Sequence, residues 1–173
     1  MSNHVLVAYA SKYGGTAGIA EKIGQILTEA GLEVTVLPAN RVPDPARYRA
    51  VVLGSGVYMG QWRREAANFL KANEKALAER PVWLFSSGPT GEGDLEKLLQ
   101  GWHFPAGLQA VADRIHPRDI AVFHGVADSA KMNFFDRWIL KNVKAPSGDF
   151  RDWQMITAWA ESIAAALKEQ APA

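Results

Sequence analysis

Apolar runs and amphipathic helical patterns alternate along most of the chain. The continuous apolar runs at 5–7 and 51–53 are typical of strands that are buried on both faces of a sheet. Near the carboxyl end, apolar residues recur every three or four positions from Ile156 to Leu167, which predicts a helix with one face on the core. This alternation predicts an α/β fold with a parallel sheet between layers of helices.

The same pattern places the individual elements. The expected strands are residues 4–10, 33–37, 50–54, 81–86 and 120–126. The expected helices, besides the last one, are residues 17–30, 64–79 and 95–99. Residues 38–47 are rich in proline and turn-forming side chains and are expected to form a loop.

Composition limits the class of protein. With 173 residues, 48% of them hydrophobic and 21% charged, the chain is expected to form one globular domain over residues 1–173. The formal net charge of +1 argues against general nucleic-acid binding. No apolar run approaches the roughly 20 residues of a membrane span, and no signal-peptide pattern is present, so a cytoplasmic protein is expected. Because the chain has no cysteine, any redox chemistry must come from a bound cofactor.

A short polar loop between the first strand and the first helix is the strongest candidate for ligand binding. Backbone N–H groups at a helix start have no partner within the helix and can bind a phosphate. Ser11 and Thr16 can add hydroxyl donors, and Gly14 and Gly15 allow close approach of the backbone. The loop fits neither G-x-x-x-x-G-K-[ST] nor G-x-G-x-x-G. The alternative is an ordinary turn whose small residues cap the helix.

Two further loops have a composition that suits the same ligand. Residues 55–62 follow the third strand and are rich in glycine and aromatic side chains, and residues 86–93 follow the fourth and are rich in glycine and hydroxyls. In an open α/β sheet these loops meet beyond the carboxyl ends of the strands. Tyr58 and Trp62 are candidates to flank a planar ring, although Trp62 could equally be a packing aromatic.

The first loop resembles the T-x-T-G-x-T phosphate loop of flavodoxins, with Ser11, Tyr13, Gly14 and Thr16 at the patterned positions. Tyr13 departs from the pattern, which has a threonine there. With the other two loops, the resemblance implies a flavodoxin-like three-layer α/β sandwich, a five-stranded parallel sheet and FMN as cofactor. The implied FMN-binding residues are Ser11, Lys12, Tyr13, Gly14, Gly15, Thr16, Ala17, Ser55, Gly56, Val57, Tyr58, Met59, Gly60, Trp62, Ser86, Ser87, Gly88, Thr90 and Gly91.

A long segment before the last helix, at about 127–152, exceeds the usual length of a connection. Within it, residues 131–144 predict an amphipathic helix. Its apolar stripe consists of Phe134, Phe135, Trp138, Ile139 and Val143, and its cations are Lys131, Arg137, Lys141 and Lys144. Such a helix can lie at a membrane interface, form the wall of a pocket for an apolar anionic ligand, or simply pack on the sheet. Asp136 is expected to be an ordinary acid of the first helical turn.

The inserted segment resembles that of the flavodoxin-type, menaquinone-dependent protoporphyrinogen oxidases, through F-x-D-R-x-I-x-K at 134–141, a glycine at 148 and Asp152-Trp153. The resemblance implies an FMN enzyme that oxidises protoporphyrinogen IX and passes electrons to a respiratory quinone, with peripheral contact to the inner face of the cell membrane. The residues implied in substrate or membrane contact are Phe135, Arg137, Trp138, Lys141 and Lys144.

Two functions from different classes remain open at this point. One is the oxidoreductase, for which the sequence indicates neither a dedicated catalytic acid–base pair nor a metal site. The other is a flavodoxin that carries electrons between protein partners. The isoelectric point of about 8.0 counts against that carrier, because acidity usually steers flavodoxins to basic partners. A domain that has lost its cofactor is a third reading of the same loops.

Overall fold

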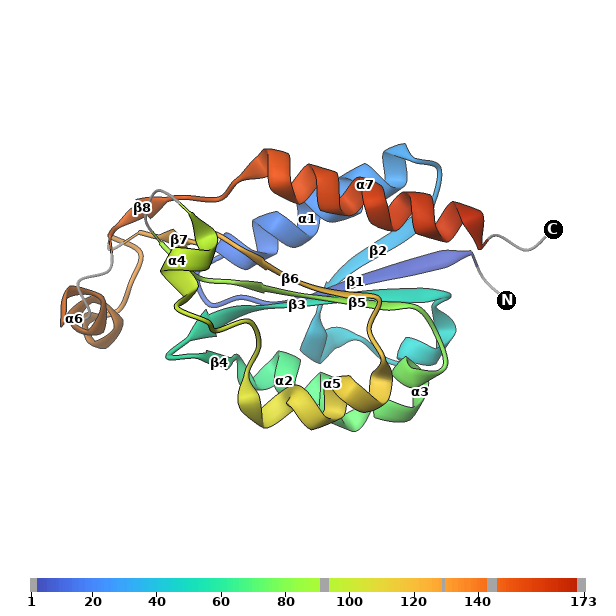
Figure 1. Cartoon of the computed structure of the whole chain (residues 1–173), viewed down its shortest axis with the longest axis horizontal. Helices are drawn as coiled ribbons and strands as arrows, with labels where there is room; N and C mark the ends of the chain where they lie inside the picture. Colours follow the sequence, from blue (N-terminus) through green and yellow to red (C-terminus); the bar gives the residue numbers. More distant parts are fainter. Residues whose placement is uncertain (1–2, 91–93, 129, 143–145, 171–173) are drawn as a thin grey trace.

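A parallel sheet forms the centre of the molecule (Figure 1). The structure is a computed structural model and describes residues 3–90, 94–128, 130–142 and 146–170. Its five parallel strands run in the order β2-β1-β3-β5-β6, and the short β4 (Gln61–Trp62) pairs antiparallel with the end of β3. The parallel strands are β1 (His4–Ala10), β2 (Glu33–Pro38), β3 (Ala50–Tyr58), β5 (Val82–Ser87) and β6 (Asp119–Phe123). The predicted flavodoxin-like α/β fold is confirmed.

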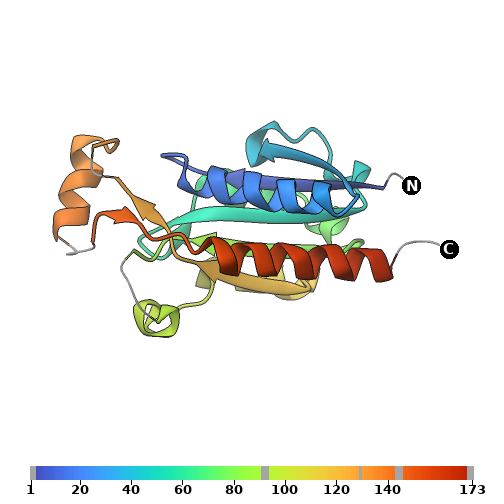
Figure 2. The same ribbon diagram turned by 90° about the horizontal axis from the view of Figure 1, so that it is seen from above.

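Helices cover both faces of this sheet (Figures 1 and 2). On one face lie α1 (Gly15–Glu29) and α7 (Trp153–Glu169). On the other face lie α2 (Arg64–Ala72), α3 (Glu74–Ala78) and α5 (Gln109–Ile115). Two short helices, α4 (Leu95–Leu99) and α6 (Phe134–Asn142), lie beyond the carboxyl ends of the strands. Among the described residues, no helix is long and apolar enough to cross a membrane.

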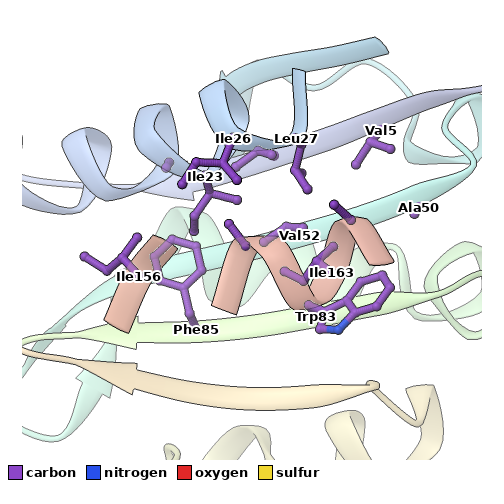
Figure 3. Close-up of a cluster of buried hydrophobic side chains, with 14 of the residues drawn as sticks. Val5, Ile23, Ile26, Leu27, Ala50, Val52, Trp83, Phe85, Ile156 and Ile163 are labelled. Carbon is purple, nitrogen blue, oxygen red and sulfur yellow. The ribbon is translucent and has the colours of Figure 1, made fainter. Parts of the chain in front are cut away.

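Each face of the sheet buries its own hydrophobic cluster. Between the sheet and the pair α1 and α7, side chains such as Ile23, Phe85 and Ile163 are fully buried (Figure 3). Leu53 and Leu70 belong to the second cluster, on the opposite face. Successive side chains of a strand point to opposite faces, so both sets of residues in β1, β3 and β5 must be apolar. This requirement explains the continuous apolar runs in the sequence.

Several elements differ from the expected boundaries. The helix expected at 64–79 is divided at Asn73, whose side-chain amide donates to the carbonyl of Phe69 (2.9 Å) and thereby competes with helical hydrogen bonding. The strand expected at 50–54 continues to Tyr58, and the strand expected at 120–126 ends at Phe123. Helix α5 was not expected. The loop at 38–47 contains two short 3-10 helices, η1 (Ala39–Arg41) and η2 (Pro45–Arg47), and a third, η3 (Ala106–Leu108), precedes α5.

The inserted segment leaves and re-enters the fold through a two-stranded ribbon. Strand β7 (Val126–Ala127) pairs antiparallel with β8 (Gly148–Asp149), and α6 lies at the far end of this excursion. The helix expected at 131–144 begins at Phe134, while residues 143–145 lie outside the described part of the chain. The ribbon therefore carries α6 beyond the carboxyl end of the sheet, where the predicted ligand loops also lie.

The packing of Gly54 gives a test of the core. A Cβ atom at Gly54 would lie 2.0 Å from the ring of Phe85, which is fully buried and has no room to move. The substitution Gly54→Ala should lower the free energy of unfolding by about 1–3 kcal/mol. Urea unfolding measures this, with Gly107→Ala as the matched control, because a Cβ there meets nothing within 4 Å. Equal stabilities for the two variants would contradict the packing described.

Candidate functional site

A pocket of about 340 Å³ opens at the carboxyl end of the sheet, between the three predicted loops and α6. Most of the expected cofactor residues line it: Ser11, Lys12, Tyr13, Gly15, Thr16, Gly56, Val57, Tyr58, Met59, Ser87, Gly88 and Thr90. Gly14, Ala17 and Gly60 do not line the pocket, and Gly91 lies outside the described residues. The three loops predicted from the sequence therefore line the pocket, but other residues that line it were not predicted.

The loop before α1 has the geometry of an anion site. Gly14 adopts a left-handed conformation (φ 90°), and its N–H donates to the Ser11 hydroxyl (3.1 Å), which closes the loop. Within the described residues, no side chain caps the start of α1 and no acid lies in its first turn. The first N–H groups of α1 are therefore free of a competing side chain and suited to a phosphate.

Close contacts between loops explain two glycines of the pocket. A Cβ atom at Gly15 would lie 2.3 Å from the Val126 side chain, and one at Gly56 would lie 3.1 Å from the hydroxyl of Thr16. The loops after β1, β3 and β6 thus approach one another through glycine backbone. Gly125, just before β7, and Val126, the first residue of β7, also line the pocket and were not expected from the sequence.

Trp62 does not line the pocket, which corrects its expected place against the ring of the cofactor. Its side chain is buried, packs edge-on against Phe104 (5.2 Å between centroids), and donates its indole N–H to the Ser86 hydroxyl (2.8 Å). Ser86 is therefore also turned away from the pocket. Ser55 has a similar structural role, since its hydroxyl accepts from the N–H of Arg63 (2.9 Å). None of these three residues lines the pocket, and their hydrogen bonds stabilise the segments next to it.

Tyr58 and Met59 remain as side chains that can meet a planar ligand. Both line the pocket, and their exposed fractions are 41% and 76%. Val57 adds an apolar side chain beside them, next to Gly88. Ser87 at the end of β5, with Gly88 and Thr90 after it, offers hydroxyl and backbone hydrogen-bonding groups.

Asp136 is the charged residue at the centre of the pocket's hydrogen bonds, and sequence reasoning missed it. It is the only buried residue of α6, all of which is described, and it lines the pocket. Its carboxylate accepts hydrogen bonds from the Lys12 ammonium, the Tyr13 hydroxyl and the Tyr58 hydroxyl, the last at 3.1 Å. One carboxylate thus joins the inserted helix to the loops after β1 and β3.

Tyr13 also takes part in the N-terminal cap of α6. The Asn133 side-chain oxygen accepts from the N–H of Asp136 (2.8 Å), as an N-cap residue does. The N–H of Asn133 donates to the Tyr13 hydroxyl (3.3 Å), which itself donates to the Asp136 carboxylate. The tyrosine hydroxyl therefore bridges the two residues of the cap. The residue that departs from the flavodoxin pattern at position 13 thus contacts the inserted segment, and this departure was a signal in the sequence that the loop has an additional partner.

Opposing effects set the charge of this cluster. Burial disfavours the ionised form of Asp136, but the hydrogen bonds from Lys12, Tyr13 and Tyr58 outweigh burial and hold the pKa of Asp136 below its usual value. The hydrogen bond to Asp136 raises the pKa of Lys12, and burial together with the same carboxylate raises the pKa of Tyr58. At neutral pH the cluster is a carboxylate–ammonium pair with a neutral Tyr58.

The three aromatic side chains of the predicted stripe, Phe134, Phe135 and Trp138, face outward, so the alternative in which this stripe packs on the sheet is wrong. The exposed fractions of Phe134, Phe135 and Trp138 are 84%, 62% and 55%. Ile139 and Leu140 line the pocket instead. Among the expected cations, Lys131 and Lys141 are exposed, and Arg137 donates to the carbonyl of Met132 (3.2 Å). Lys144 and the apolar Val143 lie outside the described residues.

A protein-family model described as a flavodoxin domain matches residues 6–154. The chain belongs to the flavodoxin family. Its cofactor, as predicted, is FMN, and the residues present fit this group: an anion site free of acids at the start of α1, apolar side chains for the ring, and backbone groups for its edge. Among the described residues, no group of three or more histidine, aspartate or glutamate side chains could hold a metal ion.

Solved structures share the fold of this chain at low sequence identity. A flavodoxin from the domain Archaea is 15% identical (TM-score 0.59) and is matched over 95% of this chain and 99% of its own. Oxidised flavodoxin 2 from Bacillus cereus is 20% identical (TM-score 0.57), with 97% and 99% covered. The rubredoxin oxygen:oxidoreductase of Desulfovibrio gigas is 16% identical (TM-score 0.62), and the match covers 99% of this chain but 38% of that enzyme. No curated protein sequence matches the chain significantly.

The different places of Tyr58 and Trp62 predict different effects on FMN binding. Tyr58→Leu should weaken FMN affinity about threefold to tenfold, because an aromatic contact contributes about 0.5–1.5 kcal/mol. Trp62→Phe should leave the affinity unchanged and lower the free energy of unfolding by about 1 kcal/mol, through loss of the hydrogen bond to Ser86. Flavin fluorescence titration and urea unfolding measure the two quantities. Tyr58→Phe separates the ring from its hydroxyl. Weaker FMN binding by Trp62→Phe would contradict the assignment.

Proposed function

We propose that this flavodoxin-family protein is an oxidoreductase which oxidises a hydrophobic substrate of the porphyrinogen class, such as protoporphyrinogen IX, and passes the electrons to menaquinone or a similar membrane quinone. The observation that carries the proposal is the outward aromatic face of α6, formed by Phe134, Phe135 and Trp138 next to the cofactor pocket. Exposed aromatic side chains beside the cations Lys131 and Lys141 suit the surface of an anionic membrane, where quinones reside.

The pocket also has the chemistry that such a substrate requires. Met132, Ile139 and Leu140 of the inserted segment form an apolar wall. Arg63 lines the same pocket, and its guanidinium contacts the Glu65 carboxylate (3.5 Å). The remaining N–H donors of the guanidinium suit a propionate of the substrate. An apolar wall with a cation at its rim matches a large apolar molecule that carries carboxylates.

The roles of the chain's own residues in this reaction are binding and orientation. When bound, FMN accepts the electrons of the substrate and releases them to the acceptor. Asp136 is the only carboxylate among the described residues that line the pocket, and the three donors around it keep it ionised. It is therefore suited to orient Lys12 and Tyr58, and it has no proton to donate.

The carrier role is supported by a separate observation. The flavodoxin structures above match this chain over almost their whole length, and the exposed Tyr58 and Met59 leave the pocket rim open to a protein partner. Rapid reduction by a flavodoxin reductase, without turnover of any small molecule, would favour the carrier over the enzyme.

An assay with FMN-loaded protein, protoporphyrinogen IX and menaquinone in vesicles tests the enzyme directly. We expect formation of protoporphyrin IX that depends on both FMN and the quinone, and that falls when Arg63 is replaced by Ala. The KM for the substrate should rise by about tenfold, as expected for loss of a charge-assisted hydrogen bond. Absence of FMN-dependent turnover would rule out the oxidase.

Membrane contact by α6 has its own test. Replacing Phe134, Phe135 and Trp138 together by Ser should weaken binding to anionic phospholipid vesicles by about tenfold or more, because apolar area is no longer buried in the interface. Vesicle sedimentation measures the binding. Met155→Ser, which removes an exposed apolar side chain of α7, is the control. Equal binding by the two variants, or no binding by the native protein, would contradict contact through α6.

A further inference from the structure

We propose that Asp136 is a positioning residue that couples the inserted helix α6 to the phosphate loop (residues 11–16), so that phosphate binding at the loop and docking of α6 strengthen each other. The inference requires only binding of a phosphate or of FMN. It is therefore independent of the substrate and the electron acceptor proposed above.

One buried carboxylate makes most of the contacts that dock α6. Asp136 is the only buried residue of the helix, while Phe134, Phe135 and Trp138 are exposed. A helix normally docks through a fully buried apolar stripe, whereas Ile139 and Leu140 of α6 are only half-buried. The hydrogen bonds of the Asp136 carboxylate are thus the main attachment of α6 to the loop after β1 and to the end of β3.

The partners of Asp136 are held in a defined arrangement. The Lys12 ammonium lies 5.3 Å from the ring centroid of Tyr13 and 6.0 Å from that of Tyr58, so it contacts two aromatic faces and the carboxylate together. Removing the negative charge would leave the ammonium among two rings and a neutral side chain. With an amide in place of the carboxylate, the cluster would lose its ion pair and one of the two oxygens that accept its hydrogen bonds.

The same loop conformation serves both the phosphate and α6. Lys12 and Tyr13 reach Asp136 from the segment that Ser11 closes by accepting from the N–H of Gly14, and this closed segment leads directly into the first N–H groups of α1. Fixing the loop with a phosphate therefore fixes the donors for Asp136, and docking of α6 fixes the loop. Such coupling is reciprocal by thermodynamic necessity.

The sign of the coupling can be reversed by one competing effect. A phosphate is an anion and could draw Lys12 away from Asp136, in which case binding would release α6. The two tyrosine hydroxyls favour the positive sign, because they bind Asp136 without serving as phosphate counter-charges. Positive coupling is the form that we propose and that the experiment can refute.

The test compares Asp136→Asn with Asp128→Asn, the same substitution at an exposed position of the same segment. Fluorescence titration gives the affinities for FMN and for riboflavin, which lacks the phosphate. We expect Asp136→Asn to weaken FMN binding by about tenfold, equivalent to 1.4 kcal/mol, and riboflavin binding much less. Asp128→Asn should change neither affinity.

Hydrogen exchange provides a second readout that does not involve the flavin. In the native protein, inorganic phosphate should slow exchange of the amides at 134–142, and in Asp136→Asn it should have no such effect. If Asp136→Asn does not fold, Tyr13→Phe decides, since it removes the hydroxyl between Asn133 and Asp136 while keeping the ring. Tyr13→Phe should weaken FMN binding by about threefold.

Three results would overturn the proposal. One is equal behaviour of Asp136→Asn and Asp128→Asn in both measurements. Another is faster exchange at 134–142 when phosphate binds the native protein, which would show that the anion competes for Lys12. The third is an equal loss of FMN and riboflavin affinity, which would place the effect of Asp136 on the ring and away from the phosphate loop.

Discussion

A parallel sheet that is buried on both faces can place polar chemistry only where its strands end. In this chain, β1, β3 and β5 present apolar side chains to both layers of helices, so no polar ligand can be held along their length. The polar and glycine-rich loops therefore gather at the carboxyl edge, and the pocket forms between them. The position of the site follows from the burial of the sheet, before any residue of the loops is considered.

The inserted segment uses this edge in a way that the basic fold does not require. A two-stranded ribbon connects α6 to the sheet, and the buried carboxylate of Asp136 on α6 binds Lys12 and Tyr13 of the phosphate loop. Tyr13 contributes to this attachment, because its hydroxyl accepts from the N–H of Asn133 and donates to the Asp136 carboxylate. The position at which the loop departs from the flavodoxin pattern is therefore one of the positions that contact the inserted segment.

The sequence was sufficient for the fold and for the loops around the pocket, because continuous apolar runs and strand-end loops are local features. It failed where a distant partner decides the outcome. Trp62 stands in a glycine-rich loop that suits a ligand, yet Phe104 and Ser86 from later segments bury it. Asp136 looked like a solvated acid, since its partners Lys12 and Tyr13 lie more than a hundred positions earlier. Helix α5 has about two turns, too few for a clear period.

The orientation of α6 is the reverse of an ordinary surface helix, and this reversal bears on function. If the helix were rotated about its axis so that Phe134 and Trp138 faced the protein, Asp136 would face solvent. Its three hydrogen bonds to Lys12, Tyr13 and Tyr58 would then be lost. The ion pair therefore fixes an orientation in which large aromatic side chains face outward. Exposed apolar area of this kind, next to cations and beside the pocket, commonly marks a surface that meets a partner or a membrane. The Lys12–Asp136 ion pair in the cofactor pocket thus also determines which side chains of α6 are exposed to solvent.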